Sequence, residues 1–383
     1  MRAAQALELI QQALLEPVET WSGYSPRATP LCVYDKDEHY FLNHPEPPQE
    51  RPTELTAATA CEIGGVVTAV IPADMCSDER TLIPLLYHEC FHAHQNGGAF
   101  RFAEQFDFFR CLAYYPELNA QYRALCAAEA EVLTNPELHA HRKAVYLAAL
   151  ARKRHSLLQE RGGLLEFEGS SERREGTASY VEQKAALALF EKDPEPVSPQ
   201  CGWSRQYAFG AAVCHLLEET LDVNWQAQVE QGAMPTRVLC DAFQDEEADL
   251  RQLHLEDKLA AEERNVEQLR SEVMAQVDNL QRAGITRVQL PQGTTIRRSF
   301  SPTRITSLGD GRLVHHGFLI VQLPSGTISV RGDLAVEDHE HGFLVLRRFP
   351  VHVSDGRLSY QSDTLSVSLV GVSQTAQGDV VIG

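Results

Sequence analysis

The sequence predicts an α+β protein with a mostly helical body, a small N-terminal sheet, a long linking helix and a C-terminal all-β sandwich or barrel. Residues 77 to about 240 are rich in Ala, Leu, Glu and Arg, and glycine and proline breaks divide them into successive helices. Residues 285–383 instead hold short apolar runs separated by glycine turns, which is typical of an all-β domain.

Three parts follow from these changes of pattern: a body over residues 1–240, a long amphipathic helix over 241–284 and a β domain over 285–383. From Asp241 to Ala283 apolar residues recur every seven positions, and Gly284 then provides a stop. The heptad residues are Leu259, Val266, Val273 and Leu280. Polar Glu262 and Gln276 interrupt the second apolar seam, so we expect this helix to pack on its own chain rather than form a dimeric coiled coil.

A strand followed by a capped helix is predicted near the N-terminus. Residues 63–71 form a β-branched run that ends at Pro72, as in a strand. The residues 77–79 (Ser-Asp-Glu) then provide a polar helix start with acidic residues in the first turn, and the glycine pair 97–98 provides a stop.

That helix carries the string H-E-x-x-H, formed by His88, Glu89 and His92. Residues four apart share one face of a helix, so the two imidazoles can bind one metal ion. Glu89 follows His88 directly and can act on a water molecule at the metal. Two neutral nitrogen ligands, an open coordination position and a nearby base are what a zinc hydrolase requires, so we expect Zn²⁺ as the cofactor.

The third zinc ligand is predicted from a later helix. The extended pattern H-E-x-x-H-x-x-G-x-x-H fails, because Gln95 and Gly98 occupy its last two defined positions. The best candidate is Glu175, which opens the string E-G-x-A-x-Y, and the small residues at 176–178 are expected to let this helix approach the motif helix closely. The alternatives that remain open are Glu129, Glu131, His139, His141, Glu172 and Glu182.

The two strings together resemble the gluzincin group of zinc metallopeptidases, over about residues 60 to 230. The resemblance implies a zincin-like metallopeptidase domain within residues 1–240, with His88, His92 and Glu175 as ligands, Glu89 as general base and a polypeptide as substrate. Thermolysin-like members carry an aspartate four residues after the ligand glutamate, where it orients the first histidine. That position is Ser179 here, so the partner that orients His88 is not identified.

Hydrolysis also needs a donor for the developing oxyanion, and Tyr207 is our candidate. Related peptidases often place a tyrosine or histidine on a helix after the glutamate ligand. Tyr180 and His215 are the alternatives. We further expect the strand that ends near Ile71 to offer a free edge, against which an extended peptide would pair.

Charge and cysteine usage limit the class of partner and the compartment. Residues 285–383 hold nine Arg, no Lys and eight acidic residues, which is a formal charge of +1. Because the whole chain has a formal charge of −19, residues 1–284 have a formal charge of −20. An acidic body repels phosphates, which argues against nucleic acid as a partner. No run of 18 apolar residues occurs, so no membrane span is expected. The nine cysteines form no C-x-x-C pair, which favours reduced thiols in the cytoplasm.

Two other functions remain open. The chain could be a peptidase-like binding or regulatory protein without turnover, although the presence of Glu89 disfavours this. It could also be a zinc hydrolase that acts on a non-peptide amide, which the sequence does not distinguish from a peptidase. The β domain could bind substrate, cover the cleft or bind a protein partner.

Overall fold

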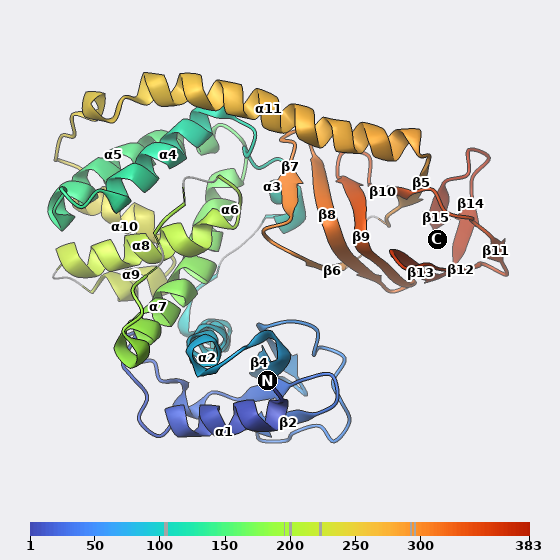
Figure 1. Cartoon of the computed structure of the whole chain (residues 1–383), viewed down its shortest axis with the longest axis horizontal. Coiled ribbons are helices and arrows are strands. Elements are labelled where there is room, and N and C mark those ends of the chain that lie inside the picture. The colour runs from blue at the N-terminus through green and yellow to red at the C-terminus, as the bar shows by residue number, and fades with distance from the viewer. Residues whose placement is uncertain (103–105, 195, 199–200, 222–223, 292, 295) are drawn as a thin grey trace.

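The computed structural model describes residues 1–102, 106–194, 196–198, 201–221, 224–291, 293–294 and 296–383. It confirms a mixed α+β architecture with a small N-terminal sheet, a helical region and a larger C-terminal sheet. Figure 1 shows the N-terminal lobe below the helical region, and helix α11 running along the top from the helices to the C-terminal sheet.

The N-terminal sheet has four strands in the order β2-β1-β4-β3, with β1 and β4 parallel and the other pairs antiparallel. The strands are β1 (Leu31–Tyr34), β2 (His39–Leu42), β3 (Thr59–Ile63) and β4 (Val66–Pro72). Helices α1 (Ala3–Ala13) and α2 (Glu79–His94) pack on the face formed by alternate residues of β1 and β4. The sheet thereby fixes the position of α2, the helix that carries the H-E-x-x-H string.

The expectation of a free edge on the strand ending near Ile71 is wrong. That strand is β4, and both of its sides are hydrogen-bonded, to β1 and to β3. The sequence 63–71 spans the Gly64-Gly65 turn of a hairpin, both of whose glycines have positive φ, so Ile63 belongs to β3. The edge next to β4 is therefore β3.

The helical region follows α2 and carries the second motif. Its helices are α3 (Phe108–Ala113), α4 (Ala120–Thr134), α5 (Ala140–Gln159), α6 (Leu164–Ser171), α7 (Thr177–Phe190), α8 (Arg205–Thr220), α9 (Trp225–Glu230) and α10 (Pro235–Ala242). A single π-helical turn, η4 (Glu172–Gly176), joins α6 to α7. Helix α7 lies along α2, and α8 packs against both α7 and η4.

The long helix α11 (Leu255–Arg282) is shorter than expected. The expected start at Asp241 is wrong, because residues 241–254 hold the end of α10, irregular chain and a short 3₁₀ turn, Leu250–Leu253. Helix α11 packs against α4 and also contacts strands β9, β10 and β5. Its buried residues are Val273, Val277 and Leu280, so its apolar seam is covered by the same chain.

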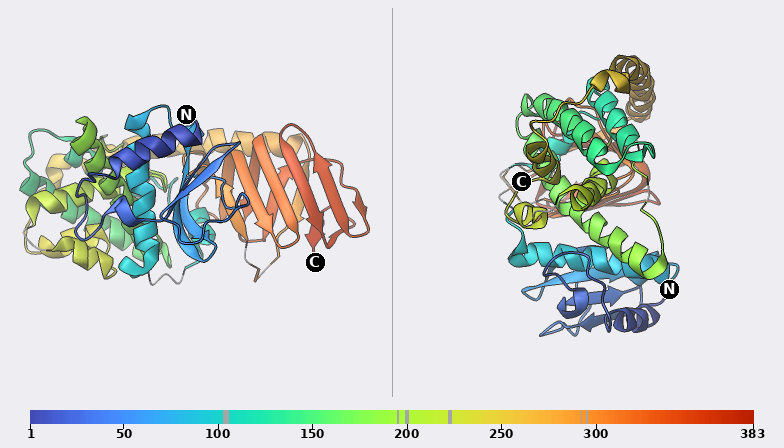
Figure 2. Two further views of the ribbon diagram at one scale, coloured as in Figure 1. Left: turned by 90° about the horizontal axis from the view of Figure 1, so that it is seen from below. Right: turned by 90° about the vertical axis from the view of Figure 1, so that its left-hand side faces the viewer.

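The C-terminal sheet is nearly closed and barrel-like, and Figure 2 shows its strands side by side next to α11. Its strands are β5 (Ile285–Gln289), β6 (Arg297–Phe300), β7 (Ile305–Ser307), β8 (Arg312–Leu323), β9 (Gly326–Asp338), β10 (Phe343–Arg347), β11 (Val353–Ser354), β12 (Arg357–Gln361), β13 (Leu365–Val370), β14 (Val372–Gln374) and β15 (Val380–Ile382). The long strand β9 pairs with β8 along its length, and with β13 and then β10 along its other side.

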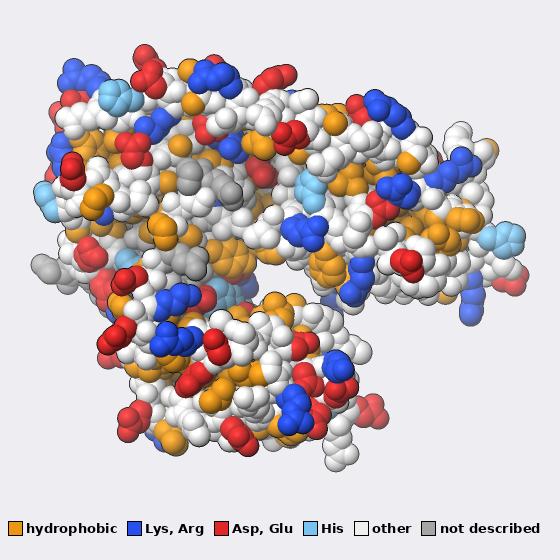
Figure 3. Space-filling view, in the orientation of Figure 1, with side chains coloured by type: hydrophobic (Ala, Val, Ile, Leu, Met, Phe, Trp, Pro, Cys, Tyr) orange, Lys and Arg blue, Asp and Glu red, His pale blue; other side chains and the backbone are white. Residues whose placement is uncertain are grey.

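The assembled lobes leave a deep hollow between them. Figure 3 shows this hollow between the N-terminal lobe and the C-terminal sheet, with histidine side chains exposed near its inner end. Within the described residues, no helix is both long and apolar enough to cross a membrane. The described cysteines form no disulfide, and all except Cys61 are buried.

Candidate metal centre

Helix α2 presents the two histidines on the face that meets α7. The helix begins at a capping box, in which the Asp78 side chain accepts from the Thr81 amide and the Thr81 hydroxyl accepts from the Asp78 amide. Pro84 lies within the first turns and leaves the helix intact through His94. His88, Glu89 and His92 therefore all lie in regular helix and are all buried.

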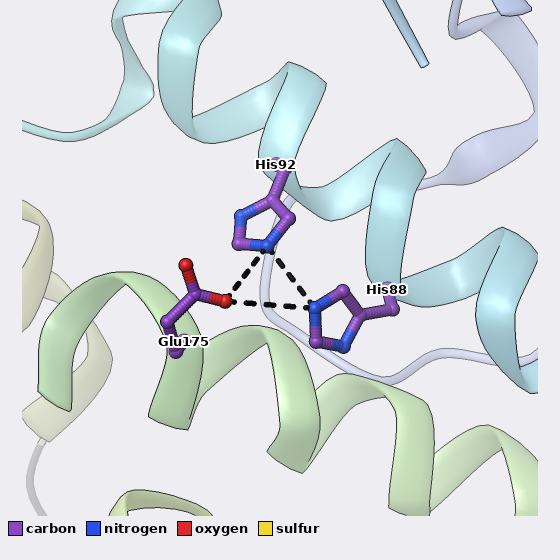
Figure 4. Close-up of side chains that lie close together, drawn as sticks. All are labelled: His88, His92 and Glu175. Atoms are coloured by element: carbon purple, nitrogen blue, oxygen red, sulfur yellow. Dashed lines mark hydrogen bonds and ion pairs between the residues drawn. The ribbon is translucent and has the colours of Figure 1, made fainter. Parts of the chain in front are cut away.

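His88, His92 and Glu175 converge on one point and form a group that could hold a metal ion (Figure 4). The Nε2 atoms of the two histidines lie 3.1 Å apart. Glu175 Oε2 lies 3.3 Å from Nε2 of His92 and 3.8 Å from Nε2 of His88. Ligands of tetrahedral zinc, with bonds of about 2.0–2.1 Å, lie about 3.3 Å from one another. The three atoms are thus spaced as ligands of one such ion would be.

The π-helical turn brings Glu175 to this point. A Cβ added to Gly176 would lie 2.7 Å from the Cα of Gly210, so η4 and α8 approach each other through two glycines. The expectation that the small residue at 176 serves contact with the motif helix is therefore wrong, because Gly176 faces α8. Glu175, its neighbour, is left to face α2, where its side chain is 13% exposed.

The ring nitrogens that face away from the candidate metal site have their own partners. Nδ1 of His88 lies 2.8 Å from Oε2 of Glu182, and Nδ1 of His92 lies 2.8 Å from Oε1 of Gln95. The Gln95 amide donates in turn to the Thr177 hydroxyl at 2.8 Å and to the Arg174 carbonyl at 3.0 Å. When Nδ1 donates to these oxygens, Nε2 carries the lone pair that a metal requires.

Sequence reasoning missed both of these partners in this role. From the sequence, Glu182 is only an alternative ligand, and Gln95 is only a departure from the longer motif. A helical signal existed for Glu182, since it follows Glu175 by seven residues, which is two turns along one face. Gln95 follows His92 by three residues, close enough for contact on one face of a helix.

Glu89 is buried within electrostatic range of the candidate ligands. It is only 5% exposed, and its Oε2 atom has no hydrogen-bond partner among the described residues. Burial raises its pKa, and the carboxylates of Glu175 and Glu182 add to this, while the two histidines oppose it. A buried carboxylate oxygen without a protein partner is rare and calls for a ligand or a water molecule.

The electrostatics of the group favour a bound cation. Burial alone would lower the pKa of His88, but hydrogen bonds with Glu175 and Glu182 outweigh it and raise the pKa to about 10. Burial would raise the pKa of Glu175, yet the two histidines hold it well below its usual range. Two carboxylates thus stabilise positive charge at the imidazoles, and two nitrogens with one carboxylate oxygen are a donor set that suits zinc.

Tyr207 lies beside this group, whereas its two alternatives do not face it. The Tyr207 ring is stacked on that of His88, with centroids 6.3 Å apart and planes 8° from parallel. Burial is the largest cause of a raised pKa for the Tyr207 hydroxyl. The Glu175 carboxylate, to which this hydroxyl is hydrogen-bonded, raises the pKa further. Tyr180 packs edge-on against Trp21 in the core, and its ring also contacts His215.

The other candidate ligands have different partners. Glu129 is fully buried between the guanidinium groups of Arg154 and Arg205. Glu172 accepts from the amide and hydroxyl of Thr236. The remaining three are placed as follows: Glu131 pairs with Lys258, His139 caps the start of α5, and His141 pairs with Glu246.

No protein-family model matches the chain, and no curated protein or solved structure is detectably similar to it. The function of the site is therefore argued from its own geometry and chemistry.

Proposed function

We propose that the protein is a zinc-dependent metallopeptidase of the gluzincin type, with His88, His92 and Glu175 as the zinc ligands. The observation that carries the proposal is the position of Glu89. Its buried carboxylate, with one oxygen unpartnered among the described residues, adjoins three ligand atoms spaced for one tetrahedral ion. Three ligands without a nearby base would suit a structural metal site. A carboxylate beside the ligands, with one oxygen available to accept a proton from water, suits hydrolysis.

Zinc bound in this site would supply a Lewis acid and would lower the pKa of a coordinated water to about 7. Glu89 accepts the proton of the attacking water and later delivers it to the nitrogen of the leaving amine. Its raised pKa suits both steps, since a carboxyl group with a pKa closer to neutrality takes up and returns a proton more readily.

The Tyr207 hydroxyl is our candidate for the donor that stabilises the oxyanion. Its ring lies parallel to the His88 ring, and its hydroxyl reaches the Glu175 carboxylate, so Tyr207 lies at the rim of the ligand group. The raised pKa keeps the phenol protonated, as a hydrogen-bond donor must be. When substrate is present, this donor turns from Glu175 to the oxygen of the scissile carbonyl.

A polypeptide is the substrate that the shape of the molecule favours. The hollow between the N-terminal lobe and the C-terminal sheet is open to solvent, so an extended chain can enter it (Figure 3). The C-terminal sheet forms one side of the hollow, which gives this part of the chain a role in substrate binding. A buried, enclosed pocket would instead suit a small amide.

The test is to replace Glu89 by Gln in the zinc-loaded full chain and to digest a peptide library. We expect Glu89→Gln to keep its zinc and to lose at least about 100-fold in cleavage rate, which is the usual contribution of a general base. Glu79→Gln, an exposed change in the first turn of the same helix, is the matched control and should cleave normally. Full activity of zinc-loaded Glu89→Gln, or a zinc-loaded wild type that cuts no peptide, would contradict the proposal.

A further inference from the structure

A cavity of about 710 Å³ adjoins the metal centre and shares Tyr207 with it. Residues from several parts of the chain line this cavity. Trp203 and Tyr207 come from the start of α8, Glu117 comes from the loop between α3 and α4, and Pro302 and Ile305 come from the segment around the start of β7. The Tyr207 ring also lies parallel to the His88 ring, with the two centroids 6.3 Å apart, so this residue links the cavity to the ligand group.

The cavity combines apolar walls with one carboxylate. Leu112, Leu269 and Ile305 lie in its lining together with Trp203. Glu117 is partly buried there, and its Oε2 accepts from the Ser307 amide at 2.9 Å. No Lys, Arg or His forms an ion pair with Glu117 among the described residues.

The arginines that also line the cavity are already neutralised. Nε of Arg123 lies 2.6 Å from Oε2 of Glu262, and Nη2 of Arg205 lies 2.7 Å from Oε2 of Glu129. Glu117 is therefore the lining carboxylate that has no ion pair among the described residues, and its ionised form makes the cavity negative. Burial raises the pKa of Glu117 to about 7, although the Ser307 amide and Arg123 oppose this rise.

We propose that this cavity is the pocket for a lysine or arginine side chain of the substrate, next to the scissile bond, with Glu117 as its countercharge. The proposal rests on the peptidase function proposed above. Lysine and arginine have an apolar stem that suits the walls and a positive end that suits Glu117. An apolar side chain of the same length would cover the carboxylate without giving it a partner, which is unfavourable.

The β domain thereby takes part in substrate selection. The Ser307 amide fixes the Glu117 carboxylate, and the Ser307 hydroxyl donates to the carbonyls of Ala113 and Tyr115 at 2.9 Å each. These bonds attach β7 to the loop that carries Glu117. The pocket is complete only when the β domain is docked on the helical region.

The experiment compares two peptide libraries that are identical except for arginine or its neutral isostere citrulline at one fixed position. The zinc-loaded full chain should cleave next to the fixed position about 10- to 100-fold faster with arginine, the range expected for hydrogen bonds to a charged group. Glu117→Gln keeps an acceptor for the Ser307 amide but removes the charge, so the ratio should approach one. Glu219→Gln, an exposed change on α8 away from the cavity, is the matched control and should leave the ratio unchanged.

Equal cleavage of the two libraries by the wild type would overturn the proposal, and so would an unchanged ratio in folded Glu117→Gln. If the zinc-loaded chain cuts neither library, the proposed peptidase function is wrong. A binding measurement then tests whether the cavity prefers a positively charged side chain. Calorimetry with N-acetyl-arginine amide and N-acetyl-citrulline amide would support the pocket if the wild type prefers arginine and Glu117→Gln does not. Equal binding of the two amides would exclude it.

Discussion

Nδ1 of His88 lies 2.8 Å from Oε2 of Glu182, which comes from the helix that directly follows the candidate ligand Glu175. The position four residues after Glu175 is Ser179, so a carboxylate one turn further along the helix orients the histidine. The longer reach of a glutamate side chain, compared with aspartate, makes contact possible from this more distant position. The orienting interaction is thus supplied from a position that the gluzincin resemblance does not indicate.

Removing the charge of Glu182 should weaken zinc binding. We expect Glu182→Gln to lower the zinc affinity by about 10- to 100-fold, because partners of metal-bound histidines set both the orientation and the basicity of the ligand. Competition with a chromophoric chelator measures this affinity. Glu219→Gln, an exposed change on α8, should leave it unchanged, and equal affinities for wild type and Glu182→Gln would refute the role of Glu182.

The candidate metal centre could be predicted from the sequence to the extent that it depends on local spacing. His88 and His92 are four residues apart on one helix, so their shared face follows from helix geometry. The approach of Glu175 depends on the packing of η4 against α8 and of α7 against α2, which are long-range contacts. The resemblance supplied that residue, whereas the partners Glu182 and Gln95 required the structure.

The contact between Gly176 and Gly210 should be essential for the position of Glu175. A Cβ at residue 176 would lie 2.7 Å from the Gly210 Cα, so Gly176→Ala must separate two backbones. We expect a loss of about 1–3 kcal/mol in the free energy of unfolding, typical of overpacking, together with weaker zinc binding. Gly97→Ala is the control, since a Cβ there meets nothing within 4 Å. Equal stability of the two variants in urea unfolding would contradict the assignment.

The fold could be predicted in class but not in detail. Apolar alternation and glycine turns indicate strands in residues 285–383, and the structure has its first C-terminal strand at Ile285. The predicted start of the long helix at Asp241 is wrong. The composition of residues 241–254 is compatible with a helix, but this segment ends in His254, which has a φ of 47°. Left-handed backbone at that residue interrupts a helix, and single-residue conformations of this kind are set by tertiary packing.

Acid should destabilise the C-terminal sheet through Glu337. This carboxylate is buried with His315 and Arg298, at 2.9 and 2.7 Å. Burial would raise its pKa, but these partners outweigh burial and lower the pKa to about 2. Because the folded-state pKa is depressed, the stabilisation is present above about pH 4.5 and is lost as the pH falls toward 2.

The size of this effect is on the order of 3 kcal/mol, because the pKa is about 2 in the folded state and 4.5 in its absence. Urea unfolding at a series of pH values measures it in the wild type. In Glu337→Gln the protein should be less stable at pH 7, where Arg298 loses its partner, and the change between pH 4.5 and 2 should be smaller. Glu340→Gln, an exposed change nearby, should keep the wild-type pH profile, and an identical profile in Glu337→Gln would exclude this cause.

The most direct test of the central claim is the zinc content per chain of the wild type, Glu175→Ala and Glu89→Gln, measured side by side by elemental mass spectrometry. We predict about one zinc per chain in the wild type and in Glu89→Gln, and a marked loss in Glu175→Ala, because three protein ligands hold a hydrolytic zinc and the base is not one of them. A wild type that binds no zinc when supplied with it, or a Glu175→Ala variant that retains a full complement, would contradict the account.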